Sequence, residues 1–195
     1  MGGFVNVLMA HNMKQILHLM RHAETAVDKK VPASDWLLTE DGLHQAESLA
    51  SASIFDAVDC IFSSTECKAL QTARPFADRL GIEILRYSEL KELDRGKEIL
   101  SDKEYLLFVE WTLNESIAVP GWESREHALN RFQAGLERIM NKGGFKEGLL
   151  ISHGLVLSMH FADLLGVDDV FSRWQRLGFC AWGTIQDNAV IKDIV

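Results

Sequence analysis

The chain has 195 residues, 47% of them hydrophobic, with a formal net charge of -8 and an isoelectric point near 5.3. This length suits one domain with its own core, while the acidic balance excludes the broad basic face of a nucleic-acid or anionic-membrane binder. No apolar stretch approaches the roughly 18 residues of a membrane helix, and the three cysteines, an odd number without CxxC spacing, predict neither a disulfide framework nor a thiolate zinc site. We therefore expect a cytoplasmic protein without nucleic-acid or membrane partners.

Residues 1–12 are interpreted as an N-terminal extension outside the folded core. They contain a short apolar run but lack the basic segment and the cleavage site of a signal peptide. Met13 and Lys14 directly precede the first strong strand pattern. We therefore expect a single domain over residues 13–195.

The first half of that domain alternates strand and helix patterns. A short apolar run predicts a buried strand at residues 16–20. Thr39 then stands in the N-cap position of a predicted helix over residues 40–50, which has an acidic first turn. A second strand is predicted at residues 58–62, followed by a helix over residues 65–80.

The middle of the chain holds one more strand and the least regular segment. A strand is predicted at residues 82–85, directly after Gly81, which has the position of a helix C-cap. Residues 96–121 follow no clear period except for an amphipathic run at 102–113. We interpret this segment as a lid-like insertion that could cover a site.

The last third returns to alternation and ends in a hairpin. A helix is predicted at residues 124–141, a strand at 148–151 and a further helix at 154–165. Residues 180–186 and 189–193 flank a two-residue turn and predict an antiparallel hairpin. Strand and helix thus alternate over most of the chain, which indicates an α/β fold with a mixed, mostly parallel sheet.

Two histidines follow apolar runs, where ligands collect in open α/β sheets. His22 comes after the first predicted strand, and His153 comes after the strand at residues 148–151. A nucleophilic imidazole must be neutral, fixed in one tautomer and surrounded by cations that hold phosphoryl oxygens. Arg21 supplies one such cation, although an Arg-His pair taken alone is better explained by a structural histidine. His18 and His160 are better interpreted as packing residues, and His160 lies about 10 Å along its helix from His153 at 1.5 Å per residue.

Five segments, in order, resemble the motifs of the histidine phosphatase superfamily, the phosphoglycerate mutase-like enzymes. Residues 21–25 resemble its RHGxT signature and residues 38–46 its LTxxGxxQA segment. Residues 63–73 follow SSxxxRAxQTA, residues 90–96 follow LxExxxG, and residues 152–154 match the second histidine motif. The resemblance covers residues 15–186 and implies a three-layer α/β/α fold of the phosphoglycerate mutase type.

The resemblance also implies the reaction. His22 would attack phosphorus and become a phosphohistidine, while Glu92 protonates the leaving oxygen and water then hydrolyses the intermediate. Arg21, His153 and Lys68 would hold the phosphoryl oxygens, and no metal or other cofactor is implied. We therefore expect a metal-independent phosphatase of phosphomonoesters, with small phosphorylated metabolites as substrates and with no prediction of oligomeric state.

Glu92 must be protonated to act as an acid. At its reference pKa only about one glutamate in 500 is protonated at pH 7, and cations in an empty pocket would lower the pKa further. The negative charge of a bound phosphate monoester would raise the pKa of Glu92 again. We expect Glu92 to become a competent acid chiefly when substrate is present.

Several positions depart from the family pattern or invite a substrate contact. Lys68 stands where the family usually has arginine, which predicts a weaker or differently angled phosphate clamp. Asp28 stands where many members have asparagine, so it either faces away or selects substrates with a cationic or hydroxyl-bearing part. Arg95 occupies a position that is often aromatic in the family. It either binds a second acidic group of the substrate or faces solvent. Thr25 completes the set of candidate substrate-binding residues.

Two other functions stay open at this stage. A cofactor-dependent phosphoglycerate mutase would need basic residues for a second phosphate, but between Gly96 and Gly121 only Lys97 and Lys103 are basic, among five acidic residues. A catalytically weak phosphate-binding module is the other alternative. Both histidines and Glu92 argue against it, whereas Lys68 and Asp28 leave it open.

Overall fold

The structure is a computed structural model that describes residues 14–96, 100–115 and 117–195. The predicted extension at residues 1–12 lies outside the described residues. Within them, no helix combines the length and the apolar character that crossing a membrane requires.

A six-stranded sheet with the order β3-β2-β4-β1-β5-β6 forms the centre of the fold. Its four parallel strands are β1 (Ile16–Arg21), β2 (Cys60–Ser64), β3 (Ile84–Tyr87) and β4 (Glu147–Ser152). The hairpin of β5 (Trp182–Gln186) and β6 (Ala189–Lys192) adds two strands, of which β5 is antiparallel to β1. The predicted mixed, mostly parallel sheet is confirmed, although β2 and β3 each begin two residues later than predicted.

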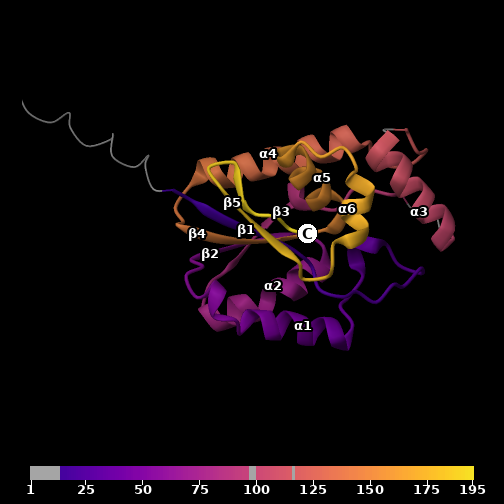
Figure 1. Cartoon of the computed structure of the whole chain (residues 1–195). Helices are drawn as coiled ribbons and strands as arrows, with labels where there is room; N and C mark the ends of the chain where they lie inside the picture. The colour runs from indigo at the N-terminus through magenta and orange to yellow at the C-terminus, as the bar shows by residue number, and fades with distance from the viewer. Residues whose placement is uncertain (1–13, 97–99, 116) are drawn as a thin grey trace, which may run out of the picture.

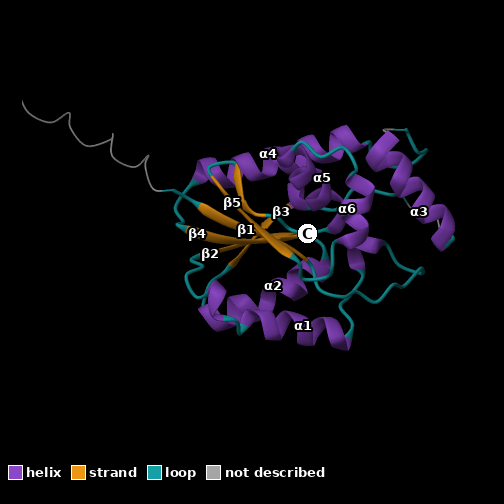
Figure 2. Cartoon of the chain, viewed as in Figure 1, coloured by secondary structure: helices purple, strands orange, loops and turns teal. Residues whose placement is uncertain are grey.

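Helices cover both faces of this sheet, so the predicted three-layer architecture is confirmed (Figures 1 and 2). α1 (Glu40–Ala50) and α2 (Cys67–Leu80) lie on one face. α4 (Arg125–Lys142) and α5 (Gly154–Leu165) lie on the other, while α3 (Asp102–Glu110) and α6 (Val170–Arg176) lie beyond one end of the sheet.

Local sequence signals explain where several helices begin and end. Thr39 accepts a hydrogen bond from the backbone N–H of Gly42, and Ser124 does the same for His127 at the start of α4. Gly81 ends α2 with a φ of 68°, a left-handed conformation that favours glycine. These caps match the predicted helix boundaries to within one or two residues.

Two segments differ from the sequence prediction. The amphipathic run predicted at residues 102–113 forms α3 and then a π-helical turn over Trp111–Glu115. α6 was not predicted, because a helix of seven residues is too short to show a clear period. Its first turn is capped by Asp169, whose side chain accepts from the backbone N–H of Ser172.

The two faces of the sheet pack into separate parts of the core. On β4, Leu149 and Ile151 join the cluster under α1 and α2, whereas Leu150 joins the cluster under α4 and α5. All three are fully buried. Burial on both faces explains why β4 reads as a continuous apolar run instead of an alternating one.

Candidate active site

The two histidines meet because their strands are adjacent and in register. Arg21 on β1 pairs with Ser152 on β4, so the next residues, His22 and His153, leave the sheet side by side. The backbone N–H of His22 donates to the carbonyl oxygen of Ser152 at 2.9 Å. The imidazole centroids lie 5.2 Å apart, and both rings are buried. The structure thus places both predicted histidines in one site at the carboxyl ends of parallel strands.

Hydrogen bonds fix the tautomer of His22. Its Nδ1 lies 2.8 Å from the carbonyl oxygen of Ala23, and a carbonyl can only accept, so Nδ1 carries the proton. The Thr25 hydroxyl lies 3.1 Å from the same Nδ1 and donates to the same carbonyl. Burial, followed by the neighbouring His153, lowers the pKa of His22 well below its usual value. His22 is therefore neutral at pH 7, with an unprotonated Nε2.

His153 contacts a serine hydroxyl through one ring nitrogen and leaves the other without a partner. Its Nε2 lies 2.8 Å from the Ser64 hydroxyl, which also accepts from the backbone N–H of Glu66. When this hydroxyl donates to Nε2, Nδ1 carries the proton of the imidazole; Nδ1 is buried and has no partner among the described residues. Burial lowers the pKa of His153 well below its usual value, with Lys68 adding to the effect.

Arg21 provides a second buried donor without a partner. Its Nη1 donates to the carbonyl oxygen of Leu177, which follows α6, and its guanidinium lies 4.3 Å from the ring centroid of Phe179. Its Nε is buried and unpaired within the described part of the chain. A buried donor without an acceptor costs free energy, and an anion bound between Arg21 and His153 would remove that cost.

Glu92 lies at the N-terminus of α5. Its carboxylate accepts from the backbone N–H groups of Leu155 at 3.0 Å and Val156 at 3.1 Å. Burial nevertheless raises the pKa of Glu92 above its usual value, against those hydrogen bonds and the charge of Arg95. Arg95 lowers the pKa of Glu92 as the sequence analysis expects of a cation, but desolvation outweighs it, so the net shift in the empty site is upward. The effect of bound substrate on this pKa stays a prediction.

Lys68 lies in the same site but is not a free cation. Lys68 is buried, and its ammonium donates to the Glu66 carboxylate and to the carbonyl oxygen of Ala33. Glu66 was missed by the sequence reasoning, although it lies inside the third motif. A charged residue two positions before the buried Lys68 was the available signal, but only the fold shows that the two side chains meet.

The remaining candidates divide between the site and its surroundings. Thr25 contacts the His22 imidazole, which makes it a positioning residue, whereas Asp28 is exposed and accepts from the backbone N–H of Lys30. Arg95 is half-buried, with its guanidinium 5.1 Å from the ring of Tyr105 and 5.9 Å from that of Trp36. The two alternatives for Arg95, contact with an acidic group of the substrate and contact with solvent, stay predictions.

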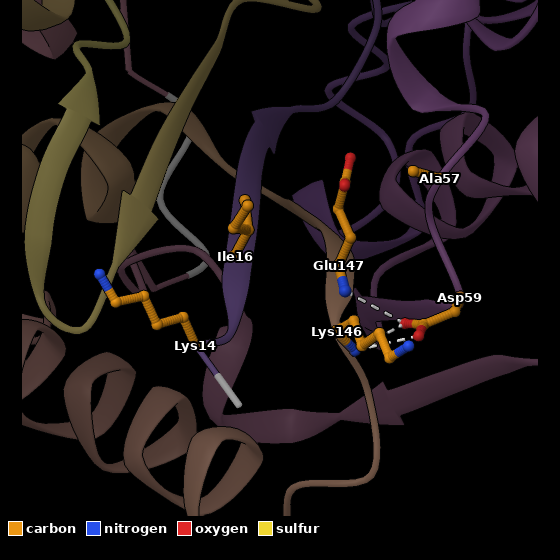
Figure 3. Close-up of a pocket in the computed structure, with 6 residues that line it drawn as sticks. All are labelled: Lys14, Ile16, Ala57, Asp59, Lys146 and Glu147. Carbon is orange, nitrogen blue, oxygen red and sulfur yellow. Dashed lines mark hydrogen bonds between the residues drawn. The ribbon is translucent and has the colours of Figure 1, made fainter. Parts of the chain in front are cut away.

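A hollow lies at the opposite ends of the strands (Figure 3). It is lined by Lys14, Ile16, Ala57, Asp59, Lys146 and Glu147. The Asp59 carboxylate points at the backbone and accepts from the N–H groups of Lys146 and Glu147. The lining of this hollow contains no histidine, cysteine, serine or threonine. Within residues 14–96, 100–115 and 117–195, no group of three His, Cys, Asp or Glu side chains could hold a metal ion.

Comparisons with known proteins agree with this geometry. The family model of the histidine phosphatase superfamily, branch 1, matches residues 17–186. The chain is 30% identical over 177 residues to the probable phosphoglycerate mutase GpmB of Enterobacter sp. (strain 638), an alignment that covers 85% of this chain and 81% of that protein.

Two solved structures share the fold. The alpha-ribazole phosphatase from Shigella flexneri matches with a TM-score of 0.73 and 23% identity, over 91% of this chain and 94% of that one. A mycobacterial glucosyl-3-phosphoglycerate phosphatase in complex with inorganic phosphate matches with a TM-score of 0.71 and 20% identity, over 93% and 99%. At these identities the similarity shows a common fold.

Proposed function

Because this chain belongs to the histidine phosphatase superfamily, we propose that it hydrolyses phosphomonoesters through a phosphohistidine on His22. The observation that carries this proposal is the hydrogen bond from Nδ1 of His22 to the carbonyl oxygen of Ala23. It leaves a lone pair on Nε2, which a nucleophile needs. A histidine held only for packing would not need a neighbouring buried arginine and imidazole with unpaired donors.

In the first half of the reaction, Nε2 of His22 attacks phosphorus and the bond to the leaving oxygen breaks. Glu92, with its raised pKa, gives its proton to that oxygen. Arg21 and Nδ1 of His153 donate to the equatorial oxygens as their charge is redistributed. Alcohol leaves, and His22 carries the phosphoryl group.

In the second half, a water molecule attacks the same phosphorus. Glu92, now a carboxylate, accepts the proton of the water, and the bond between nitrogen and phosphorus breaks. Inorganic phosphate leaves, His22 is neutral again and Glu92 is reprotonated. No step in this scheme requires a metal ion. That the activity is independent of metal remains a prediction from the sequence.

Small phosphorylated metabolites are the proposed substrate class. The relatives support this class, since their names specify alpha-ribazole, glucosyl-3-phosphoglycerate and phosphoglycerate. Arg95 between Trp36 and Tyr105 lies beside this site and is proposed to contact the part of the substrate beyond the phosphate. Asp28, exposed and bonded within its own turn, is proposed to contact substrate only at the outer rim.

A phosphoglycerate mutase is the second candidate, favoured by the names of the curated relatives. A mutase must keep its phosphohistidine from water and hold a second acidic group. The predominantly acidic segment between Gly96 and Gly121 disfavours this role. An assay of phosphoglycerate isomerisation, run beside phosphate release from the same substrate, distinguishes the two.

The decisive experiment measures phosphate release from p-nitrophenyl phosphate in the presence of a chelator. Wild type is compared with His22→Asn, whose side-chain amide can still donate to the Ala23 carbonyl but has no nucleophilic nitrogen. Turnover by wild type alone, with an acid-labile phosphoryl group trapped on His22 by mass spectrometry, supports the proposal. Equal turnover by the variant contradicts it. Phosphate binding by wild type without turnover on this or any metabolite would favour the binding module.

A further inference from the structure

A buried carboxylate lies among the groups proposed to hold the phosphoryl oxygens. Glu66 is 6% exposed, and its Oε2 accepts from the ammonium of Lys68. Its Oε1 accepts from the backbone N–H of Glu92 at 2.8 Å and lies 3.6 Å from Nε2 of His153. Glu66 occupies the N-cap position of α2, yet its side chain makes no capping bond. The carboxylate is directed to the site instead of to the helix it precedes.

The partners of Lys68 leave it little to offer an anion. An ammonium has three N–H groups, and Lys68 donates to Glu66 and to the carbonyl oxygen of Ala33. One N–H remains, and the adjacent carboxylate already balances the charge. An arriving phosphoryl group therefore meets a buried ion pair instead of a free cation.

Other charged side chains surround the ion pair of Glu66 and Lys68. Besides Lys68, the charges of Arg21, Arg95 and Arg131 act on the His153 imidazole, and Glu92 is the other carboxylate of the site. Because Glu66 is buried, water and salt screen its charge weakly. A phosphate monoester with nearly two negative charges is repelled by it at short range.

Resting on the proposed function, we infer that Glu66 is a positioning residue that competes with the phosphoryl group for Lys68 and thereby weakens the binding of substrate and of product phosphate. Such an internal anion keeps the clamp assembled when the site is empty. It also favours departure of the phosphate ion, which all the cations of the site would otherwise retain. In the sequence this interaction is visible only as a Glu-x-Lys pattern, because the turn before α2 is what brings the Glu66 carboxylate to the Lys68 ammonium.

A purely structural role for Glu66 predicts the opposite sign. Glu66→Gln keeps the shape of the side chain and an oxygen that accepts from the N–H of Glu92, but it removes the charge. If Glu66 merely held Lys68 in place, this change would misplace the ammonium and weaken phosphate binding. If Glu66 competes with phosphate, the same change strengthens it.

The test is calorimetric titration of inorganic phosphate into wild type, Glu66→Gln and a control, Glu147→Gln. Glu147 is also a partly buried acid paired with a histidine, but it lines the hollow at the far ends of the strands (Figure 3). We expect Glu66→Gln to bind phosphate about tenfold more tightly, or about 1.4 kcal/mol, with no change in the control. KM for p-nitrophenyl phosphate should fall by a similar factor and kcat should change little, because the repulsion acts on ground state and transition state alike. Unchanged or weaker phosphate binding by Glu66→Gln overturns the inference.

A second variant tests the same inference without leaving Lys68 as an unpaired buried charge, which could unfold the single variant. The double variant with Glu66→Gln and Lys68→Gln lacks both charges, so neither side chain is left as a buried ion without its partner. Attraction and repulsion are lost together, so its phosphate affinity should remain within about threefold of wild type. A larger loss would mean that Lys68 attracts phosphate without opposition, and the inference would be wrong.

The outcomes also separate this inference from the proposed function. Wild type that neither binds phosphate nor hydrolyses phosphomonoesters overturns both. Wild type that does both, together with a Glu66→Gln variant that binds phosphate no more tightly, overturns the role of Glu66 alone.

Discussion

At the scale of single residues, short contacts orient the two imidazoles of the candidate site. The Ala23 carbonyl holds the proton of His22 on Nδ1, and the Ser64 hydroxyl contacts Nε2 of His153, which leaves Nδ1 of His153 without a partner among the described residues. Burial then lowers the pKa of His22 and raises that of Glu92. Two titratable groups whose environments move their pKa values in opposite directions are what an acid and a nucleophile require at the same pH.

These shifts predict the pH dependence of activity. His22 must be neutral to attack phosphorus, and because its pKa is lowered, the neutral form persists at pH values below 6.5. Glu92 must be protonated to act as an acid, and because its pKa is raised, the protonated form persists at pH values above 4.5. The value of kcat/KM for an alkyl phosphate should therefore rise as pH falls from 8 towards 6, and fall only when His22 takes up a proton. In Glu92→Gln the alkaline limb should disappear, with a loss of about 100-fold or more in rate.

The measurement is the ratio of wild-type to Glu92→Gln activity across pH, in which the substrate's own ionisation cancels. The loss should be smaller for p-nitrophenyl phosphate, whose leaving group needs little protonation. A ratio that is constant with pH would exclude Glu92 as the acid. NMR titration of Glu92 with and without phosphate would test whether the substrate raises its pKa further.

Lys68→Arg is the second prediction at this scale. A guanidinium has five donors in a planar fork, so after satisfying Glu66 and the Ala33 carbonyl it retains donors for a phosphoryl oxygen. KM should fall about threefold, which corresponds to about 0.7 kcal/mol, and kcat should change little. The check is steady-state kinetics, with Lys146→Arg at the opposite ends of the strands as a matched control. An unchanged phosphate affinity would show that position 68 acts through Glu66 alone.

At the scale of elements, close approach of α1 to the turn after β1 positions His22, the proposed nucleophile. A Cβ added to Gly42 would lie 2.1 Å from the backbone oxygen of Glu24, far inside van der Waals contact. The same oxygen accepts from the backbone N–H of Thr39, the N-cap residue of α1. The helix is therefore fixed against the turn that carries His22 and Thr25.

Gly42→Ala should disrupt both the packing and the site. Backbone cannot yield as a flexible side chain does, so we expect a loss of about 1–3 kcal/mol in the free energy of unfolding. Displacement of Thr25 should also lower kcat more than it raises KM. Urea denaturation and steady-state kinetics provide the two readouts.

Gly178→Ala is the matched stability control, because a Cβ there meets no atom within 4 Å and the backbone φ is not positive. Equal stability of the two variants would show that α1 can move away from the turn.

At the scale of the whole molecule, the sequence predicted those features that a continuous run of residues encodes. β1 and β4 were recognisable because burial on both faces gives short apolar runs, which only His18 interrupts in β1, and the family motifs identified both histidines. What depends on contacts between distant segments was not predictable. The hydrogen bond from the backbone N–H of Glu92 to Glu66 and the burial that raises the pKa of Glu92 arise from the packing of separate segments. The contacts of Glu66 with Lys68 and of Thr25 with His22 join near neighbours, but they depend on turn geometry that the residue pattern does not show.

The core between α4 and α5 contains a histidine that links global stability to pH. His160 packs against the rings of Phe132 and Phe161, and neither of its nitrogens has a partner among the described residues. Burial lowers its pKa to about 4. The unfolded chain, with a pKa near 6.5, binds the proton more readily than the folded protein, so stability falls as pH drops from about 6.5 to 4.

His160→Leu should remove this component of acid sensitivity. The linkage predicts that His160 costs wild type about 2 kcal/mol of unfolding free energy between pH 7 and pH 5, while other titrating groups contribute equally to both proteins. Urea denaturation at the two pH values, followed by tryptophan fluorescence, gives the difference. His44→Leu, at an exposed position on α1, is the control and should retain the wild-type response. The prediction fails if His160→Leu loses as much stability on acidification as wild type, because His160 would then be solvated or paired in the folded protein.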